Sequence, residues 1–111
     1  MVRNVKASST EILGRNAARA EAMLKQLAHA GRLLILCSLT EGEKTVGQLT
    51  ALVDLSQSAV SQHLAKLRDA KLVEAEKRGQ MVFYRISSAE AQSILSVLYQ
   101  IYCKPQKSRK I

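Results

Sequence analysis

Hydrophobic residues recur with a helical period through the first part of the chain. From Glu11 to Ala28 the residues are strong helix formers, and Ser9 or Thr10 can cap the start of this helix. A second helix is predicted from about Gly31 to Leu39, with Gly42 closing it. The pattern therefore predicts two consecutive helices at the start of the chain.

Two shorter helices are predicted next. In the first, from Thr45 to Val53, Thr45 is the cap and the apolar residues have helical spacing. After the short linker Asp54-Leu55, Ser56 caps a second helix. Its inner stripe follows the i, i+4, i+7 pattern of one buried face and consists of Val60, Leu64 and Leu67.

After Lys71 the period changes from helical to two. The segments Leu72–Glu76 and Met81–Ile86 are rich in residues that favour strands, and Arg78-Gly79-Gln80 between them supplies a turn. The pattern therefore predicts a two-stranded hairpin. Ser87 or Ser88 then caps a last helix that runs through Cys103.

The last helix has two apolar faces. One consists of Ile94, Val97, Leu98 and Ile101, and the other of Leu95, Tyr99 and Tyr102. A chain this small cannot bury both terminal helices against its own core, so we expect a homodimer through the first and last helices.

Two short helices joined by a tight turn and followed by a hairpin describe a winged helix-turn-helix. The predicted fold class is mainly α (α+β), with four helices, two strands and a last helix. The chain shows no internal repeat, so residues 11–103 are expected to form one unit. Residues 1–10 and 104–111 are predicted to be flexible basic ends.

Charge and composition narrow the class of partner. The 111 residues are 47% hydrophobic and 23% charged, which is typical of a folded domain, and the formal net charge is +8. Such a charge favours nucleic acid first and an anionic membrane surface second. The longest apolar run, Leu33 to Cys37, is too short for a membrane span, and residues 1–10 lack a signal-peptide core, so we expect a cytoplasmic protein.

The fourth predicted helix has the side chains of a DNA-reading element. Its outward and N-terminal residues are short, amide or basic: Ser56, Gln57, Ser58, Ser61, Gln62 and Lys66. Glutamine can make a bidentate contact to adenine. An ordinary solvated helix would explain the polar residues equally well, but it would not explain why residues 55–67 contain no Asp or Glu. The pattern therefore favours DNA.

The hairpin tip adds basic residues to this surface. Lys77, Arg78 and Gln80 surround the turn and Arg85 follows along the second strand, which suits a wing on the sugar-phosphate backbone or in the minor groove. The alternative is a merely soluble turn. His63 either braces the fourth helix against the body or contacts a phosphate, and the sequence leaves both roles open.

These residues resemble the ArsR family of dimeric winged-helix repressors. The resemblance covers roughly residues 15–104 and is carried by the runs 27–36, 46–49, 55–73 and 82–86, with the stretch from Ser56 to Leu64 specific to that family. The family often has Pro where Ala30 stands. The resemblance implies a regulator that binds a palindromic operator in double-stranded DNA and releases it when an inducer acts. The sequence also lacks Cys-x-x-Cys, Gly-x-Ser-x-Gly and phosphate-loop motifs, so we expect no enzymatic activity.

The sequence has to be compared with two known classes of inducer, metal ions and oxidants of cysteine. Many relatives sense metals through a Cys-x-Cys pair on the third helix or Asp and His on the last helix. This chain has no Cys or His from Thr45 to Val53 and only Glu90 at the second place. A metal-responsive repressor is therefore kept as the alternative interpretation. No cofactor is expected, although the sequence leaves open a haem bound through a Cys or His.

The two cysteines favour a thiol switch. Leu36-Cys37-Ser38-Leu39 and Tyr102-Cys103 resemble the motifs of the persulfide-responsive branch, the BigR, SqrR and HlyU group. The resemblance implies that reactive sulfur species or other oxidants join Cys37 and Cys103 by a disulfide or polysulfide bridge and release the operator. Against this, Cys37 is explained equally well as an inert core residue, and an anti-silencer or architectural DNA-binding protein would need no thiol switch.

Overall fold

Each helix begins at a polar residue that caps it through its side chain. The hydroxyl groups of Ser8 and Thr45 accept from backbone N–H groups three residues on, and the side chains there, Glu11 and Gln48, accept from the cap in return. At the start of the second helix the ring of His29 accepts from the N–H of Gly31. These caps place the helix boundaries along the chain.

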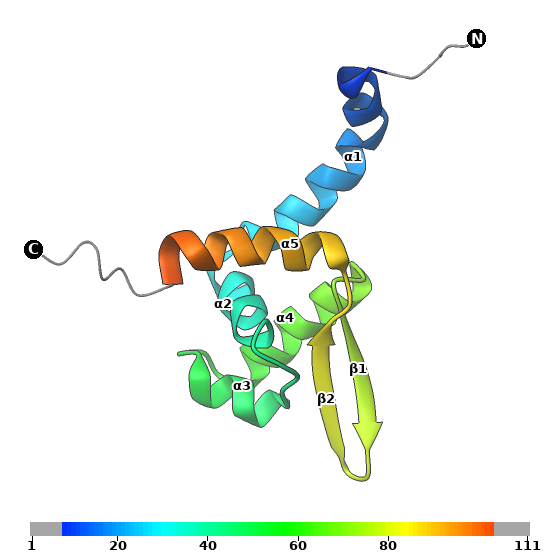
Figure 1. The fold of residues 1–111 in the computed structure, drawn as a ribbon. Helices are drawn as coiled ribbons and strands as arrows, with labels where there is room; N and C mark the ends of the chain where they lie inside the picture. Colours follow the sequence, from blue (N-terminus) through cyan, green and yellow to red (C-terminus); the bar gives the residue numbers. More distant parts are fainter. Residues whose placement is uncertain (1–7, 104–111) are drawn as a thin grey trace, which may run out of the picture.

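The computed structural model describes residues 8–103, and over this range the chain is a winged helix (Figure 1). The predicted winged helix-turn-helix is confirmed. The elements are α1 (Ser9–Leu27), α2 (Ala30–Leu39), α3 (Val46–Leu52), α4 (Gln57–Asp69), β1 (Val73–Arg78), β2 (Met81–Ile86), α5 (Ala89–Leu98) and a π-helical turn η1 (Tyr99–Cys103).

Several boundaries differ from the prediction. The first strand runs from Val73 to Arg78 instead of Leu72 to Glu76, because Arg78 pairs with Met81 and so belongs to the strand and not to the turn. The first helix starts at Ser9 instead of Glu11, because Ser8 is the cap and Glu11 completes its capping box. The last helix does not continue as α-helix to Cys103, since it changes to the π-helical turn at Tyr99. The predicted flexible ends lie for the most part outside the described residues, and Ser8, Ser9 and Thr10 belong to the start of α1.

The core draws its buried side chains from all five α-helices and from the start of β1. The predicted inner stripe of α4 is confirmed, because all three of its residues are buried. The predicted division of the last helix is wrong: Leu95 is fully buried with Ala91, whereas Val97 and Ile101 are exposed. The remaining buried side chains are Leu27, Ile35, Leu36, Leu39, Leu49, Val53, Leu72 and Val73.

The wing is an antiparallel hairpin held against the loop between α2 and α3. Its register pairs Val73 with Ile86 at the base and Arg78 with Met81 at the tip. Lys44 of the loop exchanges two backbone hydrogen bonds with Tyr84, at 3.0 and 2.8 Å. The loop therefore pairs with β2 at this single residue, and the pairing ties the wing to the helices.

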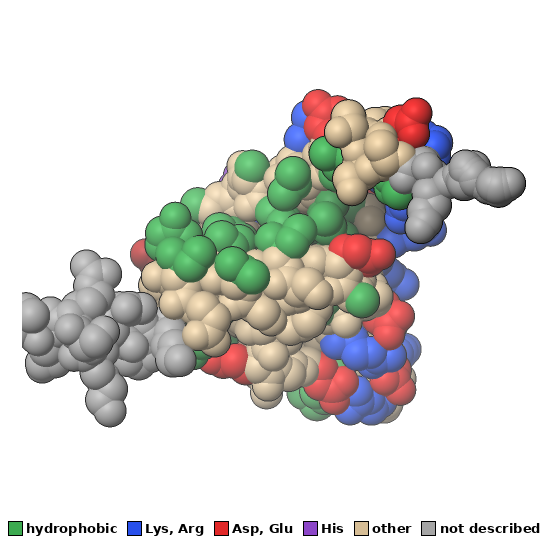
Figure 2. All heavy atoms as spheres, turned by 45° about the horizontal axis from the view of Figure 1, so that its top comes forward, with side chains coloured by type: hydrophobic (Ala, Val, Ile, Leu, Met, Phe, Trp, Pro, Cys, Tyr) green, Lys and Arg blue, Asp and Glu red, His purple; other side chains and the backbone are tan. Residues whose placement is uncertain are grey.

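Helix α1 projects away from the body (Figure 1). Of its 19 residues only Leu27 is buried. Six large apolar side chains on α1, α5 and η1 are exposed, and we call them the α1–α5 apolar set: Ile12, Leu13, Leu24, Val97, Ile101 and Tyr102. Figure 2 shows hydrophobic side chains gathered over α1 and α5. Between residues 8 and 103, no helix is both long and apolar enough to cross a membrane.

Candidate nucleic-acid interface and cysteine pair

Helix α4 presents the polar face that the sequence predicts. Its apolar stripe is buried, so the opposite side and the N-terminal turn face outward. The exposed residues include all six of the predicted DNA-reading side chains: Ser56, Gln57, Ser58, Ser61, Gln62 and Lys66. The Ser56 hydroxyl also accepts from the N–H of Ala59 at 3.0 Å, so this residue caps the helix whether or not DNA is bound.

His63 packs inward from α4 against the start of α2. Its ring centroid lies 4.7 Å from that of His29. Its Nε2 atom would be 2.8 Å from a Cβ atom on residue 31, so the glycine there makes room for the ring. The Nδ1 atom is buried without a hydrogen-bond partner among the described residues. The sequence leaves two roles open for His63, bracing α4 against the body or contacting a phosphate, and this placement favours bracing.

The surroundings of His63 oppose its protonation. Burial lowers the pKa of the His63 imidazole, and the neighbouring His29, Arg32 and Lys66 lower it further. Below about pH 6.5 the unfolded chain therefore binds a proton at His63 that the folded chain resists. The free energy of unfolding must then decrease as the pH falls from 6.5 towards the lower pKa of the folded state.

We expect urea denaturation to show this loss between pH 7.5 and pH 5.5, and His63→Gln to reduce the slope of stability against pH. The pKa values of Glu43 and Glu76 are lowered from an ordinary value of 4.5, so these two groups change the stability only below that pH and not between pH 7.5 and pH 5.5. An equal pH dependence in the wild type and the variant would contradict the prediction.

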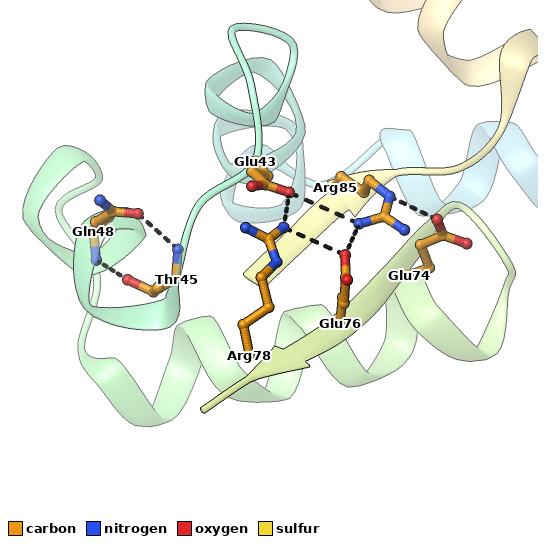
Figure 3. A network of polar contacts seen from close by, with 7 residues as sticks. All are labelled: Glu43, Thr45, Gln48, Glu74, Glu76, Arg78 and Arg85. Atoms are coloured by element: carbon orange, nitrogen blue, oxygen red, sulfur yellow. Dashed lines mark hydrogen bonds and ion pairs between the residues drawn. The ribbon is translucent and has the colours of Figure 1, made fainter. Parts of the chain in front are cut away.

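An ion-pair network covers one face of the wing (Figure 3). Arg85 on β2 donates to Glu74 at 2.7 Å and to Glu76 at 2.9 Å, both on β1. Arg78 donates to Glu76 at 3.3 Å and to Glu43 at 2.5 Å, which comes from the loop between α2 and α3. Two of the predicted DNA-contacting residues, Arg78 and Arg85, are therefore paired with carboxylates in the free chain.

The network shifts the titration of its members. The hydrogen bond from Arg78 lowers the pKa of Glu43, and the hydrogen bond from Arg85 lowers the pKa of Glu76. The Arg78 guanidinium also lies 4.3 Å from the centroid of the Phe83 ring. The other two predicted wing residues, Lys77 and Gln80, are exposed, and Lys77 makes no ion pair with any residue of the 8–103 range.

The carboxylates of this network were absent from the predicted site. Glu74 and Glu76 are two positions apart along β1, and Arg85 lies across the register from Glu74, so strand periodicity could have placed these three on one face. Glu43 has no such local indication, because it is 35 residues from Arg78.

Cys37 and Cys103 come together from distant parts of the chain. Cys37 lies on α2, half-buried and packed against the core, and Cys103 is exposed at the end of η1. Both are free thiols. Burial raises the pKa of the Cys37 thiol, and interaction with the Cys103 side chain raises it further. The Cys103 side chain therefore lies within electrostatic range of the Cys37 thiol.

Across residues 8–103 no three His, Cys, Asp or Glu side chains converge in a way that could hold a metal ion. His29 and His63 are neighbours, but the Nδ1 of His29 is occupied by the N–H of Gly31.

Together, the fold and the polar face of α4 define a winged helix-turn-helix protein. Residues 29–75 match the family model described as "Bacterial regulatory protein, arsR family". The transcriptional activator HlyU of Vibrio cholerae is 46% identical over 90 residues, which are 81% of this chain and 83% of the relative. The biofilm growth-associated repressor of Agrobacterium fabrum is 38% identical, over 78% of this chain and 74% of the relative.

Solved structures agree with the sequence relatives. The transcriptional repressor BigR from Xylella fastidiosa superposes with a TM-score of 0.81 at 34% identity, over 88% of this chain and all of the other. The chain belongs to the ArsR family, and it is a DNA-binding transcriptional regulator of the HlyU and BigR type, not an enzyme.

Proposed function

We propose that this regulator is a homodimeric repressor that releases its operator when Cys37 and Cys103 become bridged by sulfur. The proposal rests on one observation, that the Cys103 side chain lies near the Cys37 thiol. One lies on α2, which packs against α4, and the other ends the segment that follows α5. A bridge between them joins the helix-turn-helix to the last helix.

We infer the order in which the two thiols react with the persulfide from their different environments. Cys103 is exposed, whereas burial raises the pKa of Cys37 and lowers its thiolate fraction. The Cys103 thiolate attacks the outer sulfur of a persulfide RSSH, so that one S–S bond forms, one breaks and RS⁻ leaves. Cys37 then loses its proton and attacks the Cys103 sulfur, expelling HS⁻ and forming the disulfide. The two thiols are oxidised and the sulfane sulfur is reduced to sulfide.

A longer bridge follows if both cysteines become persulfides first. The terminal sulfur of the Cys37 persulfide then attacks the Cys103 sulfur, expels HS⁻ and leaves a three-sulfur bridge. A disulfide requires Cβ atoms about 3.8 Å apart, so a longer separation favours the longer bridge. The number of sulfur atoms in the bridge therefore reports on the geometry of the pair.

The dimer carries the change to DNA. We place the α1–α5 apolar set at the contact between two copies, because a helix of this length gains most of its stability from packing. Two recognition helices must lie about 34 to 36 Å apart to enter successive major grooves. A bridge that ties α2 to the end of the dimer helix alters this spacing, and affinity for the palindromic operator falls.

We propose that two elements, α4 and the wing, contact DNA. The exposed side chains of α4 read base edges, with Gln57 and Gln62 able to pair with adenine. Lys77 and Gln80 at the wing tip contact the sugar-phosphate backbone of the DNA. Arg78 and Arg85 are proposed to join them, but each must first exchange a carboxylate for a phosphate.

The test is a binding titration on an operator selected from a pool of random duplexes. We expect the reduced wild type to bind, and treatment with inorganic polysulfide to weaken binding at least about tenfold, or about 1.4 kcal/mol. Cys37→Ser and Cys103→Ser should bind before and after treatment, and reductant should restore the wild type. Intact-mass analysis should show the bridge in the wild type only. Equal loss in the variants would overturn the thiol switch.

A further inference from the structure

We infer that Glu43 competes with DNA phosphate for the wing arginines and thereby limits what the wing contributes to DNA affinity. The inference rests on the proposed DNA interface. It concerns a residue outside both recognition elements, in the loop between α2 and α3.

The position of Glu43 is fixed by the backbone around it. The next residue, Lys44, is held to Tyr84 of β2 by two backbone hydrogen bonds. This anchor places one Glu43 carboxylate oxygen 2.5 Å from Nη2 of Arg78 and 3.8 Å from Nη1 of Arg85. Glu43 therefore reaches both arginines from a separate element (Figure 3).

The charges on this face favour competition. Three carboxylates, of Glu43, Glu74 and Glu76, surround two guanidinium groups, so the network has a net charge of −1. A phosphate that approaches Arg78 meets these carboxylates as well. The Arg78 and Glu43 side chains are 43% and 35% exposed, and exposed ion pairs are weak enough to exchange partners.

Glu43 differs in one respect from the other two carboxylates. Glu74 and Glu76 lie on β1 and move with the wing, whereas Glu43 joins the wing to the helix-turn-helix. Removing its charge frees Arg78 from its shortest ion pair and leaves the backbone bridge at Lys44 in place.

The same loop provides a matched control. Glu41 carries the same charge, and its only ion pair among residues 8–103 is with Lys44 at 4.0 Å. Glu41→Gln therefore changes the net charge as Glu43→Gln does, but it leaves the arginines paired. A general effect of charge on DNA binding appears equally in both variants.

The experiment measures affinity of the reduced full chain for the selected operator and for a mixed-sequence duplex at several salt concentrations. We expect Glu43→Gln to bind on the order of fivefold more tightly than the wild type. The slope of log K against log salt should steepen by about 0.9 for each arginine that gains a phosphate, or about 1.8 for two wings. Glu41→Gln should keep the wild-type slope, and adding Arg78→Gln to Glu43→Gln should cancel the gain.

Three results would overturn the inference. They are equal effects of Glu41→Gln and Glu43→Gln, weaker binding by Glu43→Gln with an unchanged slope, and a gain that survives the removal of Arg78. Circular dichroism of each variant separates loss of folding from loss of contact. Failure of the reduced wild type to bind either duplex would instead overturn the proposed DNA interface.

Discussion

Replacing Val97 and Ile101 together by glutamate is expected to separate the dimer and to weaken operator binding by about a hundredfold or more. Both side chains are more than half exposed in the single chain, at 57% and 55%, so the substitutions leave the core of each copy intact. Charges buried in an apolar contact are costly. A single copy can occupy only one half-site, so the advantage of binding through two linked sites is lost.

Analytical ultracentrifugation and a DNA titration would check this result. Leu52→Glu is the control, since Leu52 is 58% exposed but lies on α3, outside the α1–α5 apolar set. We expect this control to remain a dimer. A double variant that sediments as the wild type does would contradict the proposed dimer contact.

Leu64→Ala is expected to lower the free energy of unfolding by about 3 to 5 kcal/mol. Leu64 is the middle residue of the buried stripe of α4, and only 1% of its surface is exposed. The substitution removes buried apolar atoms and leaves a cavity in a region where three helices meet. Because the total stability of such domains is about 5 to 15 kcal/mol, the effect is a large share of it.

Urea denaturation at one fixed protein concentration would measure the change. Leu52→Ala is the matched control, because it makes the same chemical change at an exposed position of a neighbouring helix. We expect the control to lose less than about 1 kcal/mol. Similar losses at the two positions would show that α4 does not pack as described.

Local patterns predicted the fold well, and contacts between distant segments limited the prediction of the site. The stripe of α4 and the cap at Ser56 follow from residues a few positions apart. At α1 three consecutive hydroxyl residues compete as caps, and Glu11 selects Ser8, which the capping-box spacing could have indicated. The buried stripe and the helix caps therefore depend only on residues that are neighbours in the sequence.

The faces of α5 and the wing network depend on tertiary contacts instead. Periodicity shows that the last helix has two apolar faces, but not which residues meet the core: Leu95 was grouped with Tyr102, yet Leu95 is buried and Tyr102 is exposed. In the wing, the sequence indicates the basic residues, but the partner at Glu43 is set by the bridge between Lys44 and Tyr84.

The π-helical turn at Tyr99–Cys103 has a consequence for the angular position of the last cysteine. Each residue of an α-helix advances about 100° around the axis, and a π-helical turn winds more slowly because its hydrogen bonds span one more residue. Cys103 therefore lies behind the angle that continued α-helix would give it. The winding of these five residues, as well as their number, decides whether Cys103 faces Cys37.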